Sequence, residues 1–182
     1  GQSRQERKSV SADGRVFVVG GTGLLSTEVY DNDTTTWTAK ASMAAIRDGP
    51  GVAAISGNRV LLVGGNGAGG TVATAEIYDV ALNTFTATTN APTTLTQITT
   101  TTRTQAVKLP NGRVFVTNGT ASEIFTPATS GVGGTWTVLT DTPVVQDKCT
   151  VTARLHGQVH VIGGIDADTA SMIRHTLYRS VI

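Results

Sequence analysis

An apolar segment that ends in a pair of small residues, in most copies Gly-Gly, occurs four times in this sequence. The last glycine of each copy stands at position 21, 65, 119 or 164, so the copies are 44, 54 and 45 residues apart. Self-similarity at a nearly fixed period of this length is typical of proteins built from stacked supersecondary units, each of which needs its neighbours to bury its apolar face. This repeat therefore constrains the fold more than any other feature of the chain. The copies span residues 14–21, 59–65, 112–119 and 157–164.

Three further elements recur around each apolar segment and complete a unit of four short β-strands. An alternating segment precedes it, for example at 51–55 and 104–109. A segment with an aromatic residue follows it at 27–31, 75–79 and 122–126, and in a weaker form at 174–178. In the first three units a last segment places Trp37, Phe85 or Trp136 between two threonines. We number these strands first to fourth, with the apolar segment as the second.

The second strand of each unit is apolar at consecutive positions, which is typical of a strand covered on both faces. The glycine pair that ends it supplies backbone conformations with positive φ and lets a neighbouring chain approach closely. Segments with hairpin chemistry separate the first and second strands, such as Ala12-Asp13-Gly14 and Pro110-Asn111-Gly112. We therefore expect antiparallel four-stranded sheets whose second strands are interior.

The order of a strand, a Gly-Gly pair, a tyrosine in the third strand and a tryptophan in the fourth resembles the Kelch repeat, most of all that of bacterial Kelch-repeat proteins. The sequence departs from this pattern at Asn118 for glycine, Phe85 for tryptophan, Phe125 for tyrosine, and in the weak third strand near residue 178. The resemblance implies an all-β fold, a β-propeller of Kelch-type four-stranded antiparallel blades related to that of galactose oxidase. The expected blades are 4–40, 47–88, 102–140 and 148–182; the last lacks its fourth strand, so about 3.75 blades are present.

An incomplete set of blades leaves open edges and uncovered apolar faces, which a closed ring would remove. Three interpretations follow: a fragment of a six- or seven-bladed propeller, a ring completed by a second chain such as a homodimer partner, or a four-bladed ring with one short blade. The first two are favoured, because residues 1–5 are too few to supply the missing strand.

Composition excludes several classes of protein. Charged residues make up 15% of the chain and the net charge is +1, so no nucleic-acid partner is expected. Cys149 is the only cysteine, which excludes an internal disulfide framework and a zinc site built on several thiolates. The apolar runs are too short for insertion into a membrane. The 32 threonines against 4 lysines favour exposed β-surface and, with it, an extracellular or cell-surface location, although no signal-peptide pattern precedes Gly1.

Candidate binding residues lie in the connections between second and third strands and between each unit and the next. The longest of these is the threonine-rich stretch 93–103, and long loops on a rigid scaffold are the usual binding sites. In Kelch propellers the first strand is innermost, so the resemblance implies that the mouth of a central channel is ringed by Arg47, Asp48, Arg103, Gln105, Asp147 and Lys148. The other candidates on this face are Asn66, Gln97, Asp166 and Asp168. The alternative is that all are ordinary solvated loop residues.

No residue pattern indicates catalysis, a metal or another cofactor. Asp166 and Asp168 could help to bind calcium but lack the glycine and distal glutamate of a dedicated loop, so a solvated turn is favoured. His160 replaces an apolar residue of the other units and is expected to be a packed interior histidine. The repeated tryptophans and tyrosines are expected to pack between blades. Copper-radical oxidases need a Tyr-His ligand set, and none of Tyr30, Tyr78 and Tyr178 adjoins a histidine.

We therefore expect a non-catalytic binding or structural module of a bacterial-type extracellular protein. It would recognise a protein or a glycan through the face that carries the long connections. One alternative is the propeller portion of a larger enzyme of the copper-radical oxidase kind. Another is a self-assembling structural subunit whose open ends pair with neighbouring copies.

Overall fold

The computed structural model describes residues 8–12, 14–88, 92, 94–95, 103–119, 121–129, 133–140, 149–164 and 175–179. All regular elements within these ranges are β-strands, and no helix occurs among them. The prediction of an all-β protein with four-stranded antiparallel sheets is therefore confirmed.

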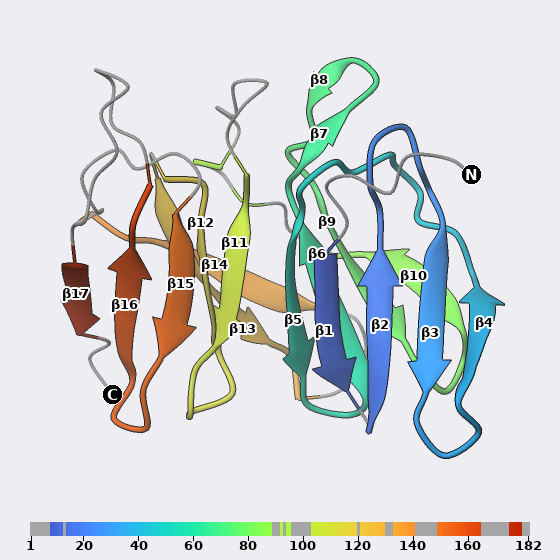
Figure 1. Ribbon diagram of the computed structural model, residues 1–182. Helices are drawn as coiled ribbons and strands as arrows, with labels where there is room; N and C mark the ends of the chain where they lie inside the picture. The colour runs from blue at the N-terminus through green and yellow to red at the C-terminus, as the bar shows by residue number, and fades with distance from the viewer. Residues whose placement is uncertain are drawn as a thin grey trace.

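The strands form successive antiparallel sheets in which each strand pairs with its neighbour along the chain (Figure 1). Sheet 1 contains β1 (Lys8–Ala12), β2 (Arg15–Val19), β3 (Thr27–Asp31) and β4 (Thr36–Lys40). Sheet 2 contains β5 (Gly51–Ile55), β6 (Arg59–Val63), β9 (Ala75–Asp79) and β10 (Thr84–Ala87). Sheet 3 contains β11 (Gln105–Lys108), β12 (Val114–Thr117), β13 (Ser122–Pro127) and β14 (Gly134–Val138). Sheet 4, within the described ranges, contains β15 (Thr150–Ala153), β16 (Gln158–Ile162) and β17 (His175–Arg179).

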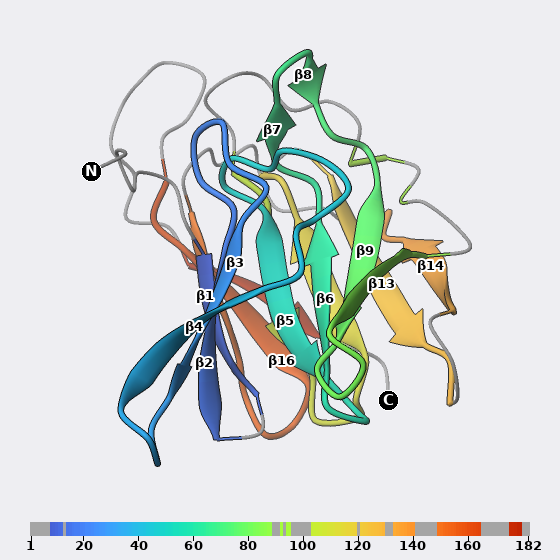
Figure 2. The ribbon, with the colours of Figure 1, turned by 90° about the vertical axis from the view of Figure 1, so that its right-hand side faces the viewer.

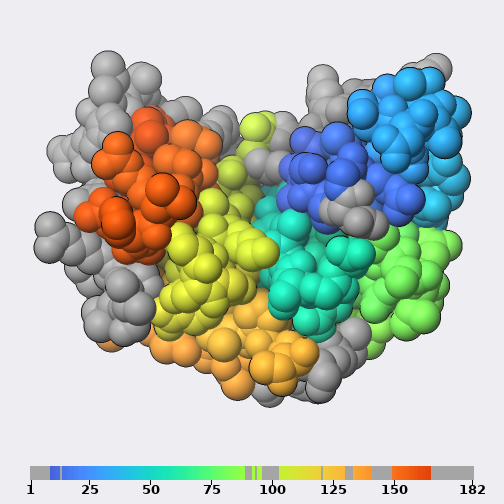
Figure 3. All heavy atoms as spheres, turned by 90° about the horizontal axis from the view of Figure 1, so that it is seen from below, coloured from blue at the N-terminus to red at the C-terminus, as the bar shows by residue number. Residues whose placement is uncertain are grey.

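The sheets stack face to face in the order of the chain. Their first strands lie closest together, because β1 contacts β5, β5 contacts β11, and β11 contacts β15. Seen from below, the sheets are successive sectors of an arc that runs from sheet 1, in blue, to sheet 4, in orange (Figure 3). The described residues form no closed ring or barrel.

Three apolar cores fill the spaces between successive sheets. We call the face of a sheet that lies toward the preceding sheet its front, and the opposite face its back. Phe17 and Val19 on the back of sheet 1 meet Val60 and Leu62 on the front of sheet 2. The next two cores repeat this arrangement: Leu61 and Val63 with Val114 and Val116, then Phe115 with Val159 and Val161.

The predicted burial of the second strand on both faces is confirmed for β6 and β12 but not for β2 and β16. Every residue of β6 and β12 is buried. In β2 burial alternates, with Phe17 and Val19 buried while Val16 is 37% exposed. The strand β16 alternates as well, with Val159 and Val161 buried. The reason is that no described sheet covers the front of sheet 1 or the back of sheet 4.

The glycine pair after the second strand lets the next sheet's incoming loop approach. Gly20 and Gly64 both have positive φ, 68° and 67°. A Cβ atom on Gly20 would overlap the carbonyl oxygen of Arg47, and one on Gly64 would overlap the side chain of Thr104. The backbone N–H of Gly21 donates to the carbonyl oxygen of Arg47 at 3.1 Å. The glycines therefore join each sheet to the loop that enters the following one.

The glycine-rich segment after β6 contains a short ladder. Strands β7 (Asn66–Gly67) and β8 (Gly70–Thr71) pair antiparallel around a turn at residues 68–69. Gly70 has a φ of 110°, a conformation that favours glycine. This hairpin rises above sheet 2 (Figure 2).

Aromatic pairs between third and fourth strands recur in the first three sheets. Their ring centroids lie 4.7 Å apart for Tyr78 and Phe85, and 4.8 Å apart for Phe125 and Trp136. Both pairs belong to the cores between sheets, as predicted. The pair in sheet 1, Tyr30 with Trp37, does not lie in a core between sheets. Trp37 is 56% exposed on the uncovered front of sheet 1.

Candidate functional site

Within sheets 1 and 2, the connections from the second strand to the third, and the connection from sheet 1 to sheet 2, lie at one end of the stacked sheets, at the top of Figure 1. We call this end the loop face. Its best described part consists of residues 20–26, 41–50 and 64–74, which connect strands of sheets 1 and 2.

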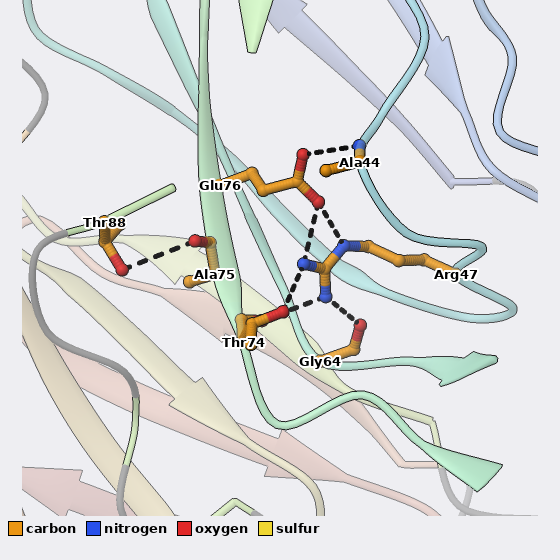
Figure 4. Close-up of polar contacts among 7 residues, drawn as sticks. All are labelled: Ala44, Arg47, Gly64, Thr74, Ala75, Glu76 and Thr88. Carbon is orange, nitrogen blue, oxygen red and sulfur yellow. Dashed lines mark hydrogen bonds and ion pairs between the residues drawn. The ribbon is translucent and has the colours of Figure 1, made fainter. Parts of the chain in front are cut away.

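A buried ion pair anchors the loop that enters sheet 2. Arg47 is fully buried, and its Nη2 lies 2.9 Å from Oε1 of Glu76 on β9. The guanidinium also donates to the carbonyl oxygens of Gly64 and Thr74, at 2.7 and 2.9 Å (Figure 4). The other oxygen of Glu76 accepts the backbone N–H of Ala44 at 2.9 Å. All charged atoms of this pair are therefore used within the protein.

The burial of Arg47 determines its role. Removal from water lowers the pKa of the guanidinium, while the charge and hydrogen bonds of Glu76 oppose that shift. The resemblance implies a position for Arg47 at the mouth of a channel, but its side chain lies inside the protein. Arg47 therefore supports the loop face from beneath and is not presented to a ligand.

Sheet 3 carries a related carboxylate with different partners. Glu123 occupies the position of Glu76 and is also fully buried. Its Oε1 accepts the backbone N–H and the hydroxyl of Thr94, at 2.6 and 2.7 Å. Its Oε2 has no hydrogen-bond partner within the part of the chain that the structure describes. A glutamate recurs at 28, 76 and 123, and this recurrence is the sequence signal that could have indicated a buried acid.

Two predicted binding residues, Asp48 and Asn66, lie side by side on the loop face. They form an antiparallel bridge in which the N–H of Asp48 donates to the carbonyl oxygen of Asn66 at 2.7 Å and the reverse bond is 2.8 Å long. Both side chains line a pocket of about 210 Å³, together with Thr22, Gly23, Ile46, Gly67 and Ala68. The structure thus brings together two residues that stand far apart in sequence.

A larger apolar pocket of about 610 Å³ lies next to this one on the loop face. The β7–β8 hairpin and the loop that enters sheet 2 form most of its wall, and Leu25 completes it. Three residues, Ile46, Gly67 and Ala68, line both pockets. The two pockets are therefore direct neighbours on the loop face.

Arg103 and Gln105 lie where the first strands meet. The side chain of Arg103 packs against Gly49. A Cβ atom added to Gly49 would lie 3.0 Å from Cγ of Arg103. Gln105 lines a pocket of about 280 Å³ between β1, β5 and β11, to which Ser9 and Thr104 contribute. The remaining candidates, Gln97, Asp147, Lys148, Asp166 and Asp168, lie outside the described residues.

The sequence analysis did not find a pocket at the opposite end of the sheets. This pocket of about 610 Å³ lies between the turns that join the first and second strands of sheets 3 and 4. Leu155, at its rim, is 87% exposed. The available signal was the large aliphatic side chain of Leu155 at a turn position that holds Ala12 in the first unit and Pro110 in the third. The pocket is lined by Lys108, Leu109, Pro110, Ala153, Arg154, Leu155, His156 and Gln158.

No cluster of three or more His, Cys, Asp and Glu side chains suited to a metal ion occurs in the described ranges. Cys149 is buried in the core between sheets 3 and 4. Tyr78 is buried, and its hydroxyl donates to Oδ1 of Asn83 at 2.8 Å. Burial, with a smaller contribution from the charge of Asp79, raises the pKa of Tyr78. No helix of the described segments has the length and apolar character needed to cross a membrane.

Comparisons with known proteins add no relationship. The sequence matches no protein-family model, and no curated protein is significantly similar to it. The fold and the pockets are therefore the basis for any functional proposal.

Proposed function

We propose that the four sheets are successive blades of a Kelch-type β-propeller, and that the chain is a non-catalytic extracellular module that binds a protein or a glycan through its loop face. The repeated order of strands, glycine pair and aromatic pair supports the Kelch assignment. The stacking of sheets through their first strands supports a radial arrangement.

One observation carries the functional proposal. The larger apolar pocket and the smaller pocket that carries Thr22, Asp48 and Asn66 adjoin each other on the loop face and share Ile46. Binding sites commonly combine apolar walls with a few fixed polar groups. Here the Arg47–Glu76 pair holds the loop from beneath, which keeps the wall of both pockets in place.

The proposal is tested by applying the purified protein to a glycan array and a peptide array. We expect a restricted set of ligands to bind. Ala45→Arg, which fills the apolar pocket with a long charged side chain, should weaken that binding by roughly tenfold or more.

Leu155→Arg is the matched control, because it adds the same charge at the opposite end of the sheets. We expect it to leave binding unchanged. The proposal is wrong if neither array shows binding, or if Leu155→Arg weakens binding while Ala45→Arg does not.

A second candidate function, a self-assembling subunit, is favoured by the front of sheet 1. Val60 and Tyr78 on the front of sheet 2 are buried against sheet 1. The equivalent positions in sheet 1 are Val16, 37% exposed, and the half-buried Tyr30 beside Trp37. This surface matches the back of another sheet of the same repeat, which a second copy of the chain could supply.

The assembly is tested by light scattering over a wide range of protein concentration. We expect a dimer or larger species that Trp37→Ser shifts toward the monomer. Leu155→Ser, which removes the most exposed apolar side chain among the large ones described, should not change the mass. A wild-type protein that stays monomeric at every concentration would exclude this second function.

A further inference from the structure

Two residues that line the small pocket on the loop face each carry a buried acceptor atom without a hydrogen-bond partner in the described part of the chain. These atoms are Oδ1 of Asp48 and Oδ1 of Asn66. Each unpaired buried acceptor carries a desolvation penalty, because it has lost its hydrogen bonds to water. Two such atoms next to each other indicate that a bound group supplies the partner that each oxygen lacks.

The backbone holds these two side chains next to each other. Asp48 and Asn66 exchange two short hydrogen bonds across an antiparallel bridge, at 2.7 and 2.8 Å. Residues paired in this way project their side chains to the same face of the ribbon, with Cβ atoms about 5 Å apart. Both side chains line the same pocket. The pair is therefore a fixed feature of the fold.

The unpaired buried atoms at the pocket are acceptors, and the Thr22 oxygen beside them acts as an acceptor too. The hydroxyl of Thr22 donates its hydrogen to Oδ2 of Asp48 at 3.2 Å, which leaves only lone pairs on the Thr22 oxygen. The unpaired atoms of Asp48 and Asn66 are a carboxylate and an amide oxygen. Such a set of oxygens suits a hard cation better than a sugar hydroxyl, which both donates and accepts.

The charge of the pocket points the same way. Asp48 forms no ion pair with any described residue, and no lysine or arginine lines the pocket. Among the described residues, no cationic side chain therefore pairs with this partly buried carboxylate. A cation would neutralise it and bind both unpaired oxygens at once.

We propose that Asp48, Asn66 and Thr22 form a binding site for a divalent cation of the Ca²⁺ type. The site contains one carboxylate, so water would complete the coordination shell. Sites with little ligand charge bind Ca²⁺ weakly, with Kd of about 0.1–1 mM in extracellular modules. The bound ion would join the β2–β3 loop to the loop before β5 and the loop after β6. Its binding would not require the ligand of the proposed function.

The site is tested by calorimetric titration of the whole chain with CaCl₂, and by thermal unfolding in CaCl₂ and in EDTA. We expect saturable binding and a higher Tm in Ca²⁺. MgCl₂ should have a smaller effect, because Mg²⁺ gives up its water reluctantly. Asp48→Asn should abolish binding, whereas Asn66→Asp, which adds a second carboxylate, should tighten it by roughly tenfold.

Asp33→Asn is the control, since Asp33 is exposed in the turn between β3 and β4, far from the loop face, and the charge change is the same. It should bind Ca²⁺ like the wild type. Absence of saturable binding to the wild type would overturn the proposal, as would equal binding by Asp48→Asn. Failure of Asn66→Asp to tighten binding would also contradict the proposal. Circular dichroism of each variant is the control that checks whether the fold is retained.

Discussion

At the scale of single residues, two ion pairs of similar length have opposite surroundings. Arg15 and Asp31 are 2.9 Å apart on the surface of sheet 1, where their side chains are 42% and 24% exposed. Arg47 and Glu76 are also 2.9 Å apart, but their side chains are 0% and 3% exposed. Burial decides the consequence, because an exposed pair is screened by water and a broken buried pair leaves an uncompensated charge.

This contrast predicts the effect of Arg47→Met on stability. The variant leaves the Glu76 carboxylate buried with only the N–H of Ala44 as a donor among its known partners. We expect the free energy of unfolding, measured in urea, to fall by about 3–5 kcal/mol.

Two further variants separate pairing from packing. Addition of Glu76→Gln to Arg47→Met should restore part of the lost stability, because the buried charge is gone. Arg15→Met should change stability by about 1 kcal/mol or less. Equal losses for Arg15→Met and Arg47→Met would show that the buried pair is not a support for the loop.

At the scale of elements, the strands and their order could be predicted because their signals are local. A largely apolar run recurs in every unit and a glycine pair follows it in three of the four, while turns with hairpin chemistry fix antiparallel pairing. The exposed front of β2 could not be predicted in this way. Val16 is as apolar as Val60, and only the presence of a sheet in front distinguishes them.

The candidate site shows the same limit. Asp48 and Asn66 could be selected as polar loop residues, but their bridge joins two connections that are separated by β5 and β6. The burial of Arg47 depends on Glu76, a strand residue that no local pattern links to the loop. Pairing between distant segments is a property of the folded chain, so sequence reasoning found the residues without finding their arrangement.

At the scale of the whole molecule, one type of interface is used three times. The back of each sheet meets the front of the next through equivalent positions of the second strands. This arrangement makes position in the stack, rather than residue type, the cause of burial. It also explains why Val16 and Trp37 lie at the surface while their counterparts in sheet 2 are packed in a core.

The stacking order is tested most directly by placing lysine at one repeat position in two sheets. Val60→Lys puts a charge into the core between sheets 1 and 2 and should lower the free energy of unfolding by about 3 kcal/mol or more. Val16→Lys, at the uncovered front of sheet 1, should lower it by about 1 kcal/mol or less, measured in urea at low protein concentration. Equal losses for the two variants, or a larger loss for Val16→Lys, would contradict the stacked arrangement.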